Sequence, residues 1–187
     1  MDILYVNACL RKESRTKWLA DRVLEKELGK YSNARVKEME LQRLAMEPLT
    51  EERLRQRNTL LQEGKTRDSL FALANQFAAA DRIIVAAPYY DLQFPALLKV
   101  YLENICVCGI AFRYSEEGIP IGLCKADELI YVTTAGGYLG DLDFGFTYLQ
   151  GLCQMLGIPK QRQIAAEGLD IVSNDPQMIL RTAANNI

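Results

Sequence analysis

Histidine is absent from this chain of 187 residues. Its absence excludes Ser-His-Asp and Cys-His catalysis, histidine zinc sites and the commonest general acid or base near neutral pH. Demanding chemistry is therefore expected to come from a bound cofactor rather than from side chains. A GxGxxG or Walker A motif is also missing, so a single terminal phosphate is a more plausible ligand group than a dinucleotide pyrophosphate or a nucleoside triphosphate.

The chain also lacks a basic excess, because 22 Lys and Arg residues face 24 Asp and Glu residues. The resulting net charge of −2 argues against a nucleic acid or an anionic membrane as partner. No apolar run approaches membrane-spanning length, and the first residues do not form a signal peptide. The five cysteines are scattered without a CxxC pair, which predicts reduced, buried thiols in a cytoplasmic protein and gives little support to a metal site.

The residues that are present alternate between strand-like and helix-like patterns. Strands are expected at 3–6, 34–39, 83–87, 128–134 and 163–166, and helices at 17–28 (ending at Gly29), 50–80 (divided at Gly64), 95–105, 143–156 and 175–184. This alternation predicts a single α/β domain over 1–187. We expect a doubly wound, five-stranded parallel sheet in the order 2-1-3-4-5, with helices on both faces. The crevice should lie at the switch point between strands 1 and 3.

The most informative stretch joins the apolar strand 83–87 to the helix 95–105. The loop between them contains Pro88, Tyr89, Tyr90, Asp91, Leu92 and Phe94. Ligands of open α/β sheets bind outside the carboxyl ends of the strands, and aromatic rings with free amides suit a flat ligand that has a polar edge. The alternative is that Tyr89, Tyr90 and Phe94 are ordinary core aromatics.

The loop after the first strand leads into a helix through Ser14, Arg15 and Thr16. The amides at a helix N-terminus are unpaired and carry a partial positive charge, which suits a phosphate. The alternative is that Ser14 only caps the helix.

The loop after the fourth strand contains Thr134, Gly136 and Gly137. Paired glycines allow the backbone to approach a ligand closely and leave amides free to donate hydrogen bonds. A plain glycine turn is the alternative interpretation.

Three segments, 87–92, 98–102 and 109–114, resemble the flavin platform of the FMN-dependent azoreductases and NAD(P)H:quinone oxidoreductases, which have a flavodoxin-like fold. The order of motifs matches from about residue 2 to residue 170, and the segment 83–114 is the specific part. The resemblance implies that hydride passes from NAD(P)H through bound FMN to a flat acceptor, such as a quinone or an azo compound. It also implies a homodimer with the flavin near the subunit boundary.

The resemblance assigns Ser14, Arg15 and Thr16 to the FMN phosphate, Pro88, Tyr89, Tyr90, Asp91 and Leu92 to the surroundings of the flavin, and Thr134, Gly136 and Gly137 to its pyrimidine side. Asp91 stands where these relatives usually have Asn. A carboxylate facing the ring would repel the charge of reduced flavin, so we expect this side chain to turn outward. Arg113 and Tyr138 match positions near the pocket rim, and Arg113 is expected to form a structural ion pair.

Two other functions remain open at this point. The first is a non-enzymatic FMN module, either an electron carrier or a flavin-binding regulatory protein. A carrier is usually strongly acidic for docking its redox partners, and a net charge of −2 weakens that version. The second is a relative that has lost flavin binding, for which Asp91 is the main indication.

Overall fold

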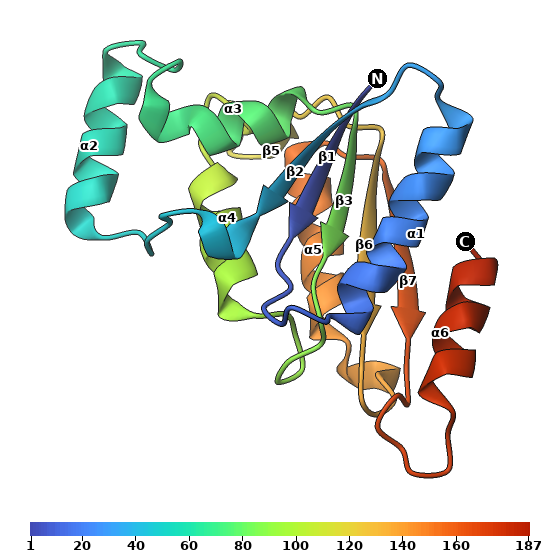
Figure 1. Ribbon diagram of the computed structural model, residues 1–187. Helices are drawn as coiled ribbons and strands as arrows, with labels where there is room; N and C mark the ends of the chain where they lie inside the picture. Colours follow the sequence, from blue (N-terminus) through green and yellow to red (C-terminus); the bar gives the residue numbers. More distant parts are fainter.

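The computed structural model describes all 187 residues, and a five-stranded parallel sheet forms its centre (Figure 1). The strands of this sheet are β1 (Asp2–Asn7), β2 (Arg35–Glu40), β3 (Arg82–Ala86), β6 (Glu128–Thr134) and β7 (Lys160–Ala166). They are ordered β2-β1-β3-β6-β7, which confirms the predicted order 2-1-3-4-5. The chain order reverses between β1 and β3, so the loops that follow these two strands diverge and leave room for a ligand.

Helices cover both faces of the sheet (Figure 1). The helices α1 (Arg15–Lys30) and α6 (Pro176–Asn185) lie on one face, and α3 (Ala72–Ala79), α4 (Ala96–Ile105) and α5 (Phe144–Leu156) lie on the other. Alternate strand residues serve the two cores: Tyr5 and Ile84 pack toward α1, whereas Leu4 and Val85 pack toward the opposite helices. Both faces are apolar, which explains the continuous apolar runs of the central strands.

The remaining elements lie outside the sheet. They are the 3-10 turns η1 (Leu41–Arg43), η2 (Ser69–Phe71) and η3 (Gly140–Leu142), the helix α2 (Glu51–Gln62), and a hairpin of β4 (Phe112–Tyr114) and β5 (Pro120–Gly122). The predicted division at Gly64 is confirmed, because this residue has φ +70° between α2 and η2. No helix has both the length and the apolar character needed to cross a lipid bilayer.

Several element boundaries differ from the prediction, and two of the differences have a clear physical reason. The first helix does not end at Gly29 but continues to Lys30, and the Tyr31 amide caps it on the Leu28 carbonyl. Gly29 keeps helical geometry, so its presence alone did not terminate the helix. The last strand begins at Lys160, three residues early, because pairing of Lys160 with Glu128 on β6 overrides the weak strand preference of a polar segment.

The predicted end of the fourth main helix is confirmed. The helix α5 stops at Leu156, and Gly157 follows in the left-handed conformation with φ +79°. The Asp143 side chain caps the other end by accepting a hydrogen bond from the Phe146 amide. The backbone of β5 passes so close to this helix end that a Cβ on Gly122 would lie 2.1 Å from the Leu156 carbonyl carbon.

Candidate functional site

The loops after β1, β3, β6 and β7 enclose a cleft of about 420 Å³ at the carboxyl edge of the sheet. Most of the residues expected from the sequence line it, namely Ser14, Arg15, Thr16, Pro88, Tyr89, Tyr90, Thr134 and Gly136. The other expected residues, Asp91, Leu92 and Gly137, do not line the cleft. Leu10, Arg11, Glu13, Ala135, Leu169 and Asp170 also contribute to its wall. The cleft therefore lies where the switch point of the sheet predicts it.

One end of the cleft is built on the start of α1. Ser14 does cap this helix, because its Oγ accepts a hydrogen bond of 3.2 Å from the Lys17 amide. The amides of Arg15 and Thr16 make no hydrogen bond within the chain, and the Ser14 hydroxyl still has its proton to donate. The capping role therefore leaves this helix end able to bind an anion as well.

A buried contact joins this helix to the sheet below the cleft. Thr16 Oγ1 and Thr134 Oγ1 lie 2.6 Å apart, and both side chains are almost fully buried. The hydrogen bond fixes the first turn of α1 against the carboxyl end of β6. The positions of the free helix amides are thus set by the sheet rather than by a flexible loop.

The loop after β3 ends in a two-residue turn. Tyr90 and Gln93 exchange two backbone hydrogen bonds of 2.9 Å, while Asp91 and Leu92 have φ +48° and φ +71°. This is the turn in which both central residues are left-handed, a conformation that Asp tolerates and that is strained for Leu. The Asp91 and Leu92 amides have no partner within the chain. The Asp91 side chain is exposed outside the cleft, as expected.

Three hydrogen bonds hold this loop against its neighbours. The Tyr89 amide donates to the Thr134 carbonyl at 3.0 Å, and the Tyr89 hydroxyl donates to the Leu142 carbonyl at 3.1 Å. The Phe144 amide donates to the Leu92 carbonyl at 3.2 Å. Phe94 is buried and packs edge-on against Tyr148, so for Phe94 the core interpretation is correct.

The glycine turn after β6 forms the opposite wall. The Asp170 amide donates to the Gly136 carbonyl, and the Gly168 amide donates to the Gly137 carbonyl. The amides of Gly136 and Gly137 have no partner within the chain. A Cβ on Gly136 would lie 2.5 Å from Asp170 Oδ2, so a larger residue there would displace the Asp170 side chain.

A family model described as flavodoxin-like fold (Flavodoxin_2) matches residues 1–187. The chain belongs to this family. It is 36% identical over 186 residues to FMN-dependent NADH:quinone oxidoreductase 2 of Clostridium acetobutylicum, which covers 96% of this chain and 92% of the relative. It is 31% identical over 177 residues to an FMN-dependent NADH:quinone oxidoreductase of Lachnoclostridium phytofermentans, covering 92% and 89%. The resemblance noted in the sequence is thereby confirmed.

Two solved structures share the flavodoxin-like fold with this chain. An azoreductase from Bacillus anthracis superposes with a TM-score of 0.86 at 19% identity, covering 99% of this chain and 95% of that structure. An FMN-dependent NADH-azoreductase from Bacillus anthracis in complex with FMN gives 0.83 at 22% identity, covering 99% and 94%. At these identities the comparison establishes the architecture of this flavodoxin-like protein and not its ligand.

The two rim residues behave differently from one another. Arg113 is exposed and forms no ion pair, so the expected structural salt bridge is wrong. Tyr138 follows the glycine turn and is 72% exposed. Its ring lies beside Gly168, where an added Cβ would be 3.2 Å from Tyr138 Cε1.

The cysteines of this flavodoxin-like chain offer no nucleophile to the cleft. Cys9 is the one nearest the loop after β1, and burial raises the pKa of its thiol to about 11. Burial also raises the pKa of Cys106 to about 11, and that of Cys124 and of Cys153 to about 12. These thiols stay protonated at neutral pH. Cys108 is exposed, and Cys106 and Cys124 are only partly buried, contrary to the expectation that all five are buried.

Proposed function

We propose that this protein is an FMN-dependent oxidoreductase that passes hydride from NAD(P)H to a flat acceptor such as a quinone or an azo compound. The names of its relatives favour NADH as the hydride donor. The observation that carries the proposal is the set of free main-chain donors on three loops around one cleft. Relatives that span nearly the whole chain are named FMN-dependent NADH:quinone oxidoreductases.

The residues at the start of α1 fit a single phosphate. The Arg15 and Thr16 amides, the Ser14 hydroxyl and the Arg15 guanidinium together provide neutral and charged donors at a helix N-terminus. Such a set suits a phosphate monoester, which is the terminal group of FMN. We assign Ser14, Arg15 and Thr16 to the FMN phosphate on this basis.

The rest of the cleft fits a flat ring with a polar edge. Pro88, Tyr89 and Tyr90 offer apolar surface, and the unpartnered amides of the neighbouring turns offer donors. We assign the loop 88–92 and Thr134, Gly136 and Gly137 to the flavin ring. When bound, FMN supplies the hydride-accepting chemistry of the reaction. The fixed amides contribute donors where negative charge develops, at no cost of reorganisation.

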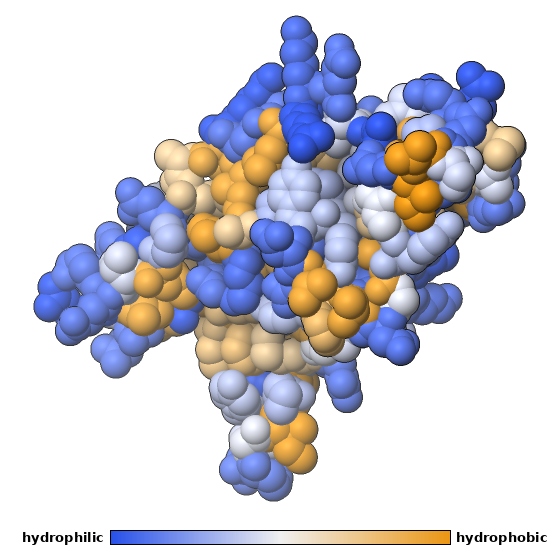
Figure 2. Space-filling model, turned by 90° about the horizontal axis from the view of Figure 1, so that it is seen from below, coloured by the Kyte–Doolittle hydropathy of each residue, from blue (hydrophilic) through white to orange (hydrophobic).

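We also propose that residues 1–187 form a single domain, that the protein is a homodimer, and that it is located in the cytoplasm. Apolar and aromatic side chains are exposed on the loops at the carboxyl edge of the sheet, and the view from below in Figure 2 shows orange patches among polar residues. They include Leu10 (45% exposed), Leu92 (43%), Tyr138 (72%), Leu142 (51%) and Phe144 (45%). A second subunit that covers this rim would remove apolar surface from water and enclose the acceptor site.

The test combines flavin binding with turnover. The purified protein is titrated with FMN, and then NADH oxidation is followed with and without an artificial quinone. We expect tight FMN binding and quinone-dependent NADH oxidation over many turnovers. FMN binding without catalytic NADH oxidation would indicate an electron carrier or a regulatory module instead. Unchanged thermal unfolding in excess FMN would exclude both, because a ligand at about 100 times its Kd adds about 2.7 kcal/mol of stability.

A further inference from the structure

Two acidic residues, Glu13 and Asp170, line the cleft, and Asp170 is the one that pairs with Arg15, although its side chain is 71% exposed. Asp170 comes from the loop after β7, and its Oδ1 accepts a hydrogen bond of 2.8 Å from Arg15 Nη1. Its other oxygen, Oδ2, lies against the backbone of Gly136, only 2.5 Å from where a Cβ would stand. The Asp170 amide, bonded to the Gly136 carbonyl at 3.0 Å, fixes the loop in this place.

The surroundings of this carboxylate are those of an anion site. A guanidinium lies on one side, and the glycine backbone with a free amide lies on the other. Arginine and an open glycine backbone form a common pair for binding a phosphoryl group. In this chain the position is already taken by a side chain that carries the same sign of charge as a phosphoryl group.

The charges around the cleft support the same reading. Arg11 and Arg15 are balanced by Glu13 and Asp170, so its charged lining side chains sum to zero. A cleft that accepts a pyrophosphate ordinarily has an excess of positive charge or a glycine-rich fingerprint. This chain has neither at the start of α1.

We propose that Asp170 is a specificity residue that fills a second anion position beside the phosphate site, and so limits the cleft to ligands with one terminal phosphate. The inference rests on the proposed function, and within it Asp170 favours FMN over FAD, whose pyrophosphate places a second phosphoryl group next to the first. Asp170 acts by occupying space and by repelling charge, and it takes no part in hydride transfer.

The experiment compares two charge removals in one cleft. Asp170→Ala removes the carboxylate that contacts Arg15 and Gly136, whereas Glu13→Ala removes an exposed lining carboxylate that has no ion-pair partner. FMN and FAD are titrated into wild type and both variants by flavin fluorescence. We expect Asp170→Ala to improve FAD binding relative to FMN by about tenfold or more. Glu13→Ala should change both affinities by the same small factor.

Two further measurements separate this inference from the proposed function. Thermal unfolding with inorganic phosphate or inorganic pyrophosphate can be measured without flavin. Compared with wild type, Asp170→Ala should show a larger rise in Tm with pyrophosphate but not with phosphate. Adding Arg15→Met to Asp170→Ala should abolish that gain. If Asp170→Ala does not fold, Asp170→Asn removes the charge at nearly constant volume and is read in the same assays.

The inference is overturned if the ratio of FAD to FMN affinity in Asp170→Ala equals the wild-type ratio, or if Glu13→Ala shifts that ratio equally. Either result counts even when FMN binds tightly. A wild-type protein that binds no flavin defeats the proposed function, and the pyrophosphate measurement then decides the role of Asp170 independently.

Discussion

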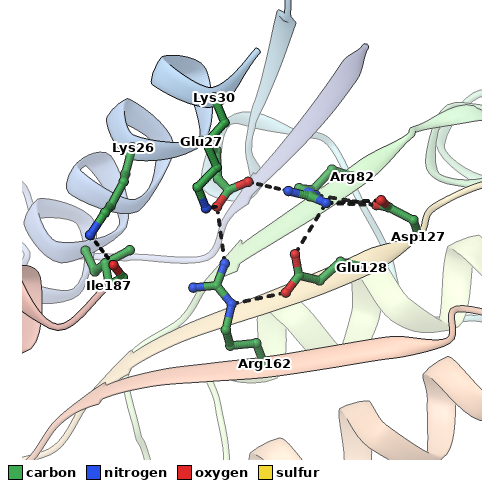
Figure 3. A network of polar contacts seen from close by, with 8 residues as sticks. All are labelled: Lys26, Glu27, Lys30, Arg82, Asp127, Glu128, Arg162 and Ile187. Carbon is green, nitrogen blue, oxygen red and sulfur yellow. Dashed lines mark hydrogen bonds and ion pairs between the residues drawn. The ribbon is translucent and has the colours of Figure 1, made fainter.

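Glu27 is a carboxylate with no exposed surface, although it lies on a surface helix. Figure 3 shows it between three cations: Arg82 at the start of β3, Lys30 one turn along α1, and Arg162 on β7. Lys30 Nζ is 2.7 Å from Oε1, Arg162 Nη2 is 3.2 Å from Oε1, and Arg82 Nη1 contacts Oε2. The Glu27→Gln variant removes the charge while keeping the volume of the side chain.

The stability lost in Glu27→Gln depends on how well the remaining cations are paired after the charge of Glu27 is removed. Removing one member of a buried ion pair costs about 3–5 kcal/mol, because its partner stays buried without compensation. Arg82 is only 8% exposed but keeps Asp127 and Glu128 as partners, which favours the lower end of that range. We expect a loss of about 3 kcal/mol in the free energy of unfolding. For a chain of this size that corresponds to a fall in Tm of roughly 6–12 °C.

The pH dependence provides a second signature. Burial opposes ionisation of Glu27, but hydrogen bonds from Lys30 and Arg82 outweigh it and hold the pKa of Glu27 below its ordinary value. A carboxyl group with a lowered folded-state pKa stabilises the protein fully above its unfolded pKa of about 4.3 and loses this contribution as pH falls. The gap between wild type and Glu27→Gln should therefore be widest at neutral pH and should narrow in acid.

Urea unfolding followed by circular dichroism measures both effects. Glu25→Gln is the matched control, because Glu25 is on the same helix and its exposed side chain pairs only with Arg22. That exposed pair should contribute less than about 1 kcal/mol. If the Glu27→Gln and Glu25→Gln variants unfold within about 0.5 kcal/mol of each other, the reasoning about the buried network is refuted.

Three shorter predictions concern the cleft and the glycines. Ser14→Ala combined with Thr16→Ala should weaken FMN binding at least about tenfold in a fluorescence titration, because the lost Ser14 hydrogen bond to a charged group costs roughly 1.5–3 kcal/mol and the lost Thr16–Thr134 hydrogen bond no longer holds the first turn of α1 in place; an unchanged titration would leave Ser14 as a helix cap only. Asp91→Asn should leave the flavin midpoint potential nearly unchanged because this carboxylate faces outward, and a rise of about 30 mV, worth about 1.4 kcal/mol, would contradict that orientation. Gly29→Ala should stabilise the protein by up to about 1 kcal/mol, whereas Gly157→Ala should destabilise it by at least as much because its φ is +79°; denaturant midpoints that move in the same direction would count against both arguments.

Local sequence signals predicted the elements that depend on short-range chemistry. Gly157 and the following Pro159 marked the end of α5 because a left-handed residue and a proline act within one turn. Pro95 marked the start of α4, although it occupies the N-cap rather than the first helical position. The loop between β3 and α4 was recognisable for the same reason, since its aromatics and its boundaries lie within one short segment.

Long-range pairing accounts for what the sequence did not reveal. Leu169 and Asp170 line the cleft because their amides bond to Ala135 and Gly136, more than thirty residues earlier in the chain. No short motif around residues 167–170 indicated that this segment would face the cleft. The ion pair between Arg15 and Asp170 spans 155 residues and has no local signature at all.

The contact between the backbones of Gly122 and Gly157 has a practical consequence for engineering this protein. A Cβ on Gly122 would lie 2.1 Å from the Leu156 backbone, so this position accepts no side chain, and one on Gly157 would lie 3.0 Å from Gly122 Cα and would strain the contact. The base of the hairpin is therefore fastened to the end of α5, while its exposed tip at 116–118 is bonded only to itself through Ser115. Exposed tips of this kind tolerate inserted residues, so a peptide tag or a fluorescent label is best placed there. The backbone contact between Gly122 and Gly157 would hold the base of the labelled hairpin in a fixed position.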